Sequence, residues 1–199
     1  SNAQTTVYDA DFSNNGDGFS DHTSASPPAT GPTSVGPFGA LPNSWGLSYE
    51  IAPGTDTSAN SFKVVSGELQ SDDWGGQGIF TSQSIDLSSI SSISISAIGV
   101  NSGANDNDFT YFYILDNGSR VETVIGATSN GDAVNYSVSN LDVSGNSLLV
   151  VGFEFSENGG GDGYDISQFK VTSASSSGNS APVISNISNL PVSPTSSDA

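Results

Sequence analysis

Short runs that alternate between apolar and polar residues recur along the chain. Ile93, Ile95 and Ala97 alternate with serines, the period-two pattern of a strand with one buried face. Comparable signals predict further strands at residues 7–12, 45–51, 62–65, 68–70, 78–81, 121–125 and 164–172. No stretch sustains the 3.6-residue period of an amphipathic helix. The pattern therefore predicts an all-β chain.

Two strand candidates, residues 109–115 and 148–155, are apolar on both faces and are expected at the centre of a sheet. Asp116-Asn117-Gly118-Ser119 follows the first and is a strong hairpin signal. Residues 20–43 are rich in Pro, Gly, Ser and Thr, which predicts one long loop. Many short antiparallel strands separated by turns indicate a sandwich or a barrel.

The chain divides into one module and its flanks. Residues 1–3, Ser-Asn-Ala, resemble the remnant of a cleaved tag and are left out of the fold. Residues 4–172 form the predicted module, and residues 173–180 a Ser/Gly linker. Residues 181–199 open with Ala-Pro-Val-Ile, which indicates the start of a following immunoglobulin-like domain. The alternative is a tail that packs back on the sandwich.

Charge and composition exclude several classes of function. The chain has 3 Lys+Arg against 21 Asp+Glu, a net charge of −18. Nucleic-acid binding rests on basic side chains that neutralise phosphates, so nucleic acids and anionic membranes are disfavoured. The absence of Cys excludes thiol catalysis and a disulfide scaffold. No apolar run approaches the ~20 residues that span a bilayer. A secreted or cell-surface protein, monomeric and rich in turns, is expected.

A family resemblance appears in two segments. Residues 76–88, Gly-Gln-Gly-Ile-Phe-Thr-Ser-Gln-Ser-Ile-Asp-Leu-Ser, resemble the G-x-x-W-x-S-x-x-I-D-I-S segment of jelly-roll modules in secreted proteins of marine Bacteroidetes-type bacteria. Residues 164–171, Tyr-Asp-Ile-Ser-Gln-Phe-Lys-Val, are similar to their closing strand. The resemblance covers about residues 4–172 and implies an antiparallel jelly-roll β-sandwich, like carbohydrate-binding modules attached to polysaccharide-degrading enzymes. Phe80 stands where Trp is common, so the resemblance does not name the ligand.

The resemblance also implies a structural Ca²⁺ between the first and last strands, held by carboxylate and carbonyl oxygens. Asp9 and Asp11 are two residues apart and so share a face of the first strand. Asp165 begins the last strand, and the three carboxylates converge if the two strands pair. The alternative is that they are solvated turn residues, as is also expected of residues 105–108 and of Asp162.

An aromatic platform for sugar rings is a second candidate site. Trp74 lies in a polar loop with Asp73 and Gln77 beside it, a setting that suits a ligand contact. Tyr111 and Tyr113 share a strand face and could line a concave sheet. The alternative for such rings is packing in the core.

Catalytic constellations are not evident. His22 is the only His, lies in a Ser/Thr-rich segment and has no evident partner. No nucleophile elbow is present, and among so many acids a carboxylate pair carries no weight, although Glu154 on a central strand is of interest. We therefore expect a non-catalytic module that binds a neutral or weakly charged polysaccharide or cell-surface glycan. The alternatives are a structural or adhesive spacer without a small ligand and, third, a small glycan hydrolase.

Overall fold

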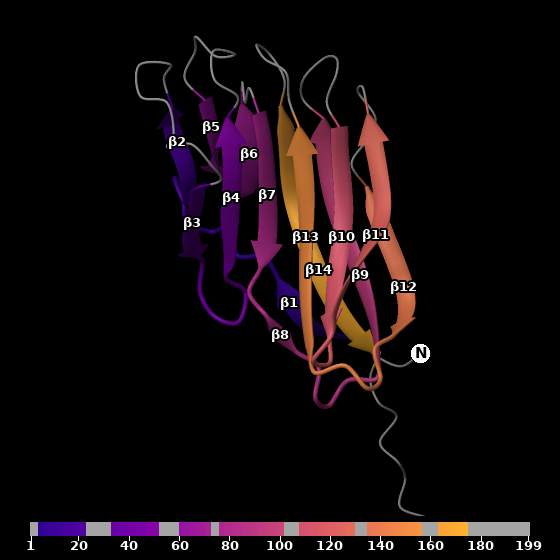
Figure 1. The fold of residues 1–199 in the computed structure, drawn as a ribbon. Helices are drawn as coiled ribbons and strands as arrows, with labels where there is room; N and C mark the ends of the chain where they lie inside the picture. The colour runs from indigo at the N-terminus through magenta and orange to yellow at the C-terminus, as the bar shows by residue number, and fades with distance from the viewer. Residues whose placement is uncertain are drawn as a thin grey trace, which may run out of the picture.

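Two antiparallel seven-stranded sheets stack face to face, and apolar side chains fill the space between them (Figure 1). The computed structural model describes residues 4–22, 33–51, 60–72, 76–101, 108–129, 135–156 and 163–174. Within these ranges the chain is all strand and turn, and the predicted all-β, antiparallel jelly-roll β-sandwich is confirmed. No helix of the described part is long and apolar enough to cross a membrane.

Sheet A has the hydrogen-bonded order β12-β9-β14-β6-β5-β2, and β1 also pairs with β14. Its strands are β1 (Gln4–Asp9), β2 (Gly18–His22), β5 (Asn60–Val65), β6 (Glu68–Asp72), β9 (Ser92–Asn101), β12 (Tyr136–Asp142) and β14 (Tyr164–Ala174).

Sheet B has the order β11-β10-β13-β7-β4-β3, and β8 also pairs with β13. Its strands are β3 (Thr33–Phe38), β4 (Trp45–Ile51), β7 (Gly76–Ser82), β8 (Ile85–Asp86), β10 (Asp108–Asp116), β11 (Arg120–Ser129) and β13 (Leu148–Ser156).

The two strands predicted to be central are central. β10 lies between β11 and β13, and β13 lies between β10 and the pair β7 and β8. The predicted hairpin joins β10 to β11, with Asp116 opposite Arg120 and Gly118 at φ 98°. Glycine reaches a positive φ without steric cost, which explains its place in this tight turn.

The prediction of one loop over residues 20–43 was wrong, because β2 extends to His22 and β3 occupies Thr33–Phe38. Both strands lie at the edges of their sheets. An edge strand tolerates Pro, such as Pro37, because one side of it has no ladder to complete. β1 ends at Asp9 instead of continuing to Phe12, and β12 was not predicted. β14 reaches Ala174, and the predicted following domain lies outside the described residues.

A layer of aromatic rings joins the sheets. Phe153 of β13 is stacked on Phe80 of β7 and on Phe109 of β10, each at a ring-centroid distance of 4.8 Å. Phe169 of β14 meets Phe153 from the opposite sheet at 5.9 Å. These rings are essentially inaccessible to solvent. Large rings bury the most apolar area per residue, so this layer dominates the stability of the sandwich.

Glycines leave room for several rings. A Cβ built on Gly78 would lie 2.2 Å from the ring of Phe155, the residue opposite it on β13. A Cβ on Gly126 would lie 2.1 Å from the ring of Tyr136. The ring therefore takes the place of a missing side chain, and the backbone and the ring fix each other's positions.

Gly78→Ala should lower the free energy of unfolding by about 1–3 kcal/mol, because Phe155 is buried and cannot yield to the new methyl group. Gly46→Ala on the adjacent strand β4 is the matched control, since its Cβ meets only the Val35 carbonyl oxygen at 3.4 Å. Chemical denaturation measures both. Equal stability of the two variants would show that the ring does not need the space at Gly78.

Candidate functional site

The two tyrosines proposed as a sugar platform lie inside the sandwich. The Tyr111 side chain is 0 % exposed, and its ring lies 4.6 Å from the rings of Phe109 and Tyr136. Burial raises the pKa of the Tyr111 hydroxyl. Tyr113 is 9 % exposed and belongs to the same core. Stacking on a sugar needs an open ring face, so the shared face of these tyrosines serves packing in this structure.

The polar loop around Trp74 can be followed only in part. Trp74 and Asp73 lie outside the described residues. Gln77 lies near the start of β7 on the outer side of sheet B, and its side chain is exposed. Its Nε2 donates a hydrogen bond to Oε1 of Glu154 on β13. Gln77 and Glu154 are thereby brought together on the solvent side of sheet B.

The predicted metal ligands are spread along two paired strands. β1 and β14 do pair, as expected, but the register sets Asp9 opposite Lys170, whose Nζ lies 3.4 Å from Asp9 Oδ2. Asp165 lies five residues earlier on β14, about 17 Å of extended strand away, opposite Gln70 and Val100. The described residues contain no group of three His, Cys, Asp or Glu that could hold a metal. Calcium binding stays a prediction.

Asp11 connects the turn after β1 to the loop between β3 and β4 by hydrogen bonds. Its Oδ1 accepts the Ser13 N–H at 3.1 Å, and its Oδ2 accepts the Ala40 N–H at 2.9 Å. Its backbone carbonyl also accepts the Nε1–H of the buried Trp45 at 2.9 Å. Hydrogen bonds from Ser13 and Ala40 hold the pKa of the Asp11 carboxyl below its ordinary value. The carboxylate thus ties the turn after β1 to the segment before β4.

The solvent side of sheet B carries apolar residues where a sandwich strand normally carries polar ones. On β10, Phe109, Tyr111 and Tyr113 belong to the core between the sheets, whereas Phe112 and Ile114 alternate with them on the outer side, where both are still buried. On β13, Leu148 and Val150 alternate in the same way with core residues. We call Phe112, Ile114, Leu148 and Val150 the apolar stripe.

The register makes the apolar stripe continuous. Ile114 lies opposite Val150, and Phe112 lies opposite Gly152. A Cβ on Gly152 would lie 2.5 Å from Cζ of Phe112, so the Phe112 ring leans across β13 where no side chain interferes. The stripe therefore covers two neighbouring strands without a polar interruption.

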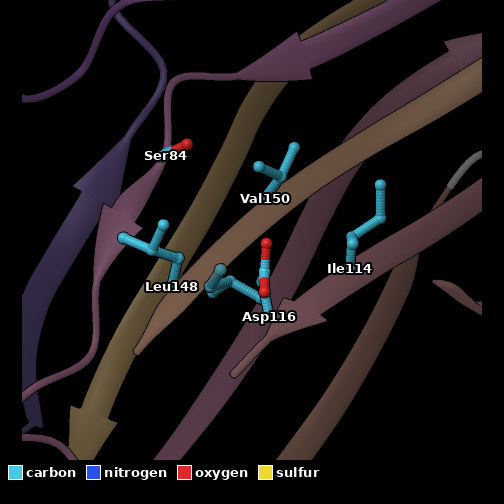
Figure 2. A pocket seen from close by; sticks show the side chains of 6 residues that line it. Ser84, Ile114, Asp116, Leu148 and Val150 are labelled. Atoms are coloured by element: carbon cyan, nitrogen blue, oxygen red, sulfur yellow. The ribbon is translucent and has the colours of Figure 1, made fainter. Parts of the chain in front are cut away.

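One end of the apolar stripe forms a pocket (Figure 2). Side chains of β10 and β13 form its floor and wall, and Ser84, on the segment between β7 and β8, contributes a hydroxyl. The Asp116 carboxylate stands among the apolar side chains in this view. The lining residues are Ser84, Ile114, Asp116, Leu148, Leu149 and Val150.

Carboxylates border the apolar stripe. Asp86 and Asp116 lie opposite Leu148 on its two neighbouring strands. Glu122 of β11 lies opposite Ile114, and Glu154 lies two residues beyond Gly152 on β13. Apolar surface with a few polar groups at its border is the usual make-up of a small-molecule site. The pocket itself has a volume of about 30 Å³, roughly that of one water molecule, so a sugar ring would lie across this surface and not inside the pocket.

Sequence reasoning missed most of this surface. Asp116 was interpreted only as a turn residue, and Ile114, Leu148 and Val150 only as parts of buried strands. Glu154 was noted, but without its partner Gln77. The available signal was that residues 109–115 and 148–155 are apolar at successive positions. In a two-layer sandwich one side of each strand points away from the core, so such runs place apolar residues on the outer side of the sheet, and of these Leu148 is exposed.

No protein-family model matches the sequence, and no curated protein matches it at a significant level. Similar solved structures include the C-terminal family 22 carbohydrate-binding module of Clostridium thermocellum xylanase 10B, with 11 % identity and a TM-score of 0.42, covering 79 % of this chain and 92 % of that one.

A family 61 module in complex with β-1,4-galactotriose shares 13 % identity at a TM-score of 0.37, covering 63 % of this chain and 80 % of that one. A xylan-binding family 15 module shares 12 % at 0.39, covering 73 % and 98 %. At such values a neighbour's ligand says nothing by itself about the ligand of this chain. The resemblance to modules of marine bacteria stays a prediction.

Asp11→Ala should lower the free energy of unfolding by about 1 kcal/mol at neutral pH, because two hydrogen bonds to the loop are lost. Folding lowers the pKa of the Asp11 carboxyl, so the stability that the native protein has over Asp11→Ala is complete above the ordinary carboxyl pKa of about 3.9. That advantage fades as the pH falls through the lowered value. Asp11→Asn, which keeps one acceptor and does not titrate, should lose less stability. Denaturation at pH 7 and pH 3 measures the effect; a pH-independent gap between native protein and Asp11→Ala would contradict it.

Proposed function

We propose that this chain is a non-catalytic, extracellular module that binds a neutral or weakly charged glycan along the apolar stripe of sheet B. The observation that carries the proposal is the outer side of sheet B, where the exposed Leu148 and the half-buried Val150 lie beside the buried Phe112 and Ile114, hydrogen-bond acceptors border them, and a small pocket lies at one end. Pyranose rings have apolar faces formed by C–H groups and hydroxyls at their edges, and this surface matches both.

The outer side of sheet A supplies a comparison within the same molecule. On β9 the residues that alternate with the core are Ser92, Ser94 and Ser96, and apolar Ile98 and Val100 follow only at one end of the strand. A polar exterior is thus compatible with this fold. Core packing does not explain why the exposed position Leu148 on β13 is apolar, which favours a binding role for this residue.

The polar groups of sheet B suit hydroxyl ligands. Glu154 already accepts a hydrogen bond from Gln77. When a sugar binds, such a carboxylate–amide pair can exchange this hydrogen bond for hydrogen bonds to the sugar hydroxyls. Ser84 can donate and accept, and Asp116 can accept at the pocket. Hydrogen bonds to charged acceptors are stronger than neutral ones, which favours orientation of the bound ring.

Leu148→Ala should weaken glycan binding about tenfold, since it removes apolar area that a ring would cover. Ile98→Ala on sheet A is the matched control, with an isomeric side chain of similar exposure, 47 % against 38 % for Leu148. Affinity electrophoresis in gels that contain polymeric xylan or β-1,4-galactan measures retention. The thermal midpoints of both variants report on folding.

Retention of the native protein by none of these glycans would contradict the proposed function. Equal retention of the native protein and Leu148→Ala would leave glycan binding standing and contradict its placement on the apolar stripe. Equal losses in Leu148→Ala and Ile98→Ala would also contradict that placement.

A structural Ca²⁺ is the second part of the proposal, and its support is the chain's uncompensated acidity and oxygen-rich composition. Calcium added to EDTA-treated protein should then give a binding heat in calorimetry and raise the melting temperature, because an ion that binds only the folded state stabilises it. Magnesium at the same concentration is the control. No heat and an unchanged melting temperature would remove calcium from the proposal.

A further inference from the structure

We infer that the bound glycan is built of hexopyranose units and that the exocyclic hydroxymethyl group of one unit enters the pocket of sheet B. This inference rests on the proposed function and names the class of sugar that the same surface binds. Hexose polymers are then preferred over pentose polymers such as xylan, whose rings carry no hydroxymethyl group. Three properties of the pocket support this preference: its size, its lining and the way in which its carboxylate is held.

The size of the pocket limits what can enter it. Its volume is about 30 Å³, and a water molecule in the liquid takes up roughly 30 Å³. A ring that lies across Leu148 can therefore place only a small substituent inside. Hydroxyls bonded directly to a pyranose ring stay close to the ring, whereas the hydroxyl of a hydroxymethyl group stands one carbon further out. Among the substituents of a neutral hexose, the hydroxymethyl group thus reaches furthest into such a pocket.

The lining combines apolar walls with two groups that bind hydroxyls. Ile114 and Val150 lie opposite each other on β10 and β13 and form part of the apolar lining. Asp116 lies opposite Leu148 on one side of β13, and Ser84 precedes β8, which pairs with β13 on the other side. Figure 2 shows the Ser84 hydroxyl and the Asp116 carboxylate on either side of β13. A hydroxymethyl group offers the same combination, since its CH₂ is apolar and its hydroxyl both donates and accepts.

The Asp116 carboxylate is held in place by its own turn. Its Oδ1 accepts the Gly118 N–H at 2.8 Å, and the Asp116 backbone carbonyl oxygen accepts the N–H and the hydroxyl of Ser147 at 2.9 and 3.0 Å. A carboxylate has about four lone-pair sites, so the hydrogen bond from Gly118 leaves capacity for a sugar hydroxyl. Arg120 lies opposite Asp116 on β11. A carboxylate beside a cation still accepts hydrogen bonds, so this capacity does not depend on the net charge of the surface.

A hydroxymethyl group satisfies both polar groups of the pocket. Its O–H donates to the Asp116 carboxylate, its oxygen accepts from the Ser84 hydroxyl, and its CH₂ covers Leu148. A 6-deoxy sugar would place a methyl group beside the carboxylate and displace water without supplying a hydrogen bond, which costs free energy. A xylose unit has only a hydrogen atom at this position and leaves the pocket to solvent. The pocket therefore discriminates by one substituent, whereas the apolar stripe contacts features common to all pyranose rings.

Affinity electrophoresis of the native protein tests the preference for hexoses. Separate gels contain β-1,4-galactan, glucomannan, mixed-linkage β-glucan or xylan at matched concentrations. At least one of the three hexose polymers should bind about tenfold more tightly than xylan, which is the effect of about one hydrogen bond to a charged acceptor.

Variants of Ser84 test the pocket itself. The Ser84 side chain is exposed, so Ser84→Leu should leave the fold intact while its larger side chain occupies the pocket. It should lower the affinity for the retained hexose polymer about tenfold, and Ser84→Ala, which removes only the hydroxyl, should lower it about threefold. Ser137→Leu is the matched control, because Ser137 is an exposed serine on β12 of sheet A. This control should change the affinity less than twofold, and thermal midpoints report on the folding of all three variants.

The outcomes distinguish this inference from the proposed function. Retention by xylan that equals or exceeds retention by every hexose polymer would overturn the hexose preference and leave glycan binding standing. An unchanged or higher affinity of a folded Ser84 variant for the hexose polymer would do the same, as would equal losses in Ser84→Leu and Ser137→Leu. Retention by none of the four polymers would overturn both the inference and the proposed function.

Discussion

The stacking of aromatic rings between the two sheets is the constraint on which the other features depend. Phe153 is held between Phe80 and Phe109 within sheet B and meets Phe169 from sheet A. Rings of this size leave little freedom for their neighbours, because a well-packed interior tolerates neither a void nor an added methyl group. The same layer takes up Tyr111, so this tyrosine, which the sequence alone offered as a ligand contact, is part of the core instead.

With the interior filled in this way, apolar residues in excess of the core requirement have to lie outside. Phe112, Ile114, Leu148 and Val150 lie on that outer side, where Phe112 and Ile114 are buried and Leu148 is exposed. Gly152 lets the Phe112 ring lie across the sheet, so the surplus forms a continuous surface. Packing and binding are therefore linked: one side of each central strand builds the core, and the other offers a surface.

The sequence was informative where local patterns decide the structure. The run at 109–115, the Asp116–Ser119 turn and the run at 148–155 predicted central strands and a hairpin, as found. The edge strands β2 and β3 were missed because their Pro, Gly and Ser content looks like a loop, and neighbours supply the ladder that makes them strands. The relation of Asp9 to Asp165 could not be predicted, because the register of two distant strands depends on packing across the whole sheet. The pocket depends on another such register, that of β13 with β10 and β8, and so it could not be predicted either.

The pairing of β1 with β14 has one more consequence. Gln4 lies opposite Ala174, so the incoming and outgoing backbone meet at a single end of the sandwich (Figure 1). In a longer polypeptide, a domain whose first and last strands end side by side branches off the chain, instead of lying in line with its neighbours.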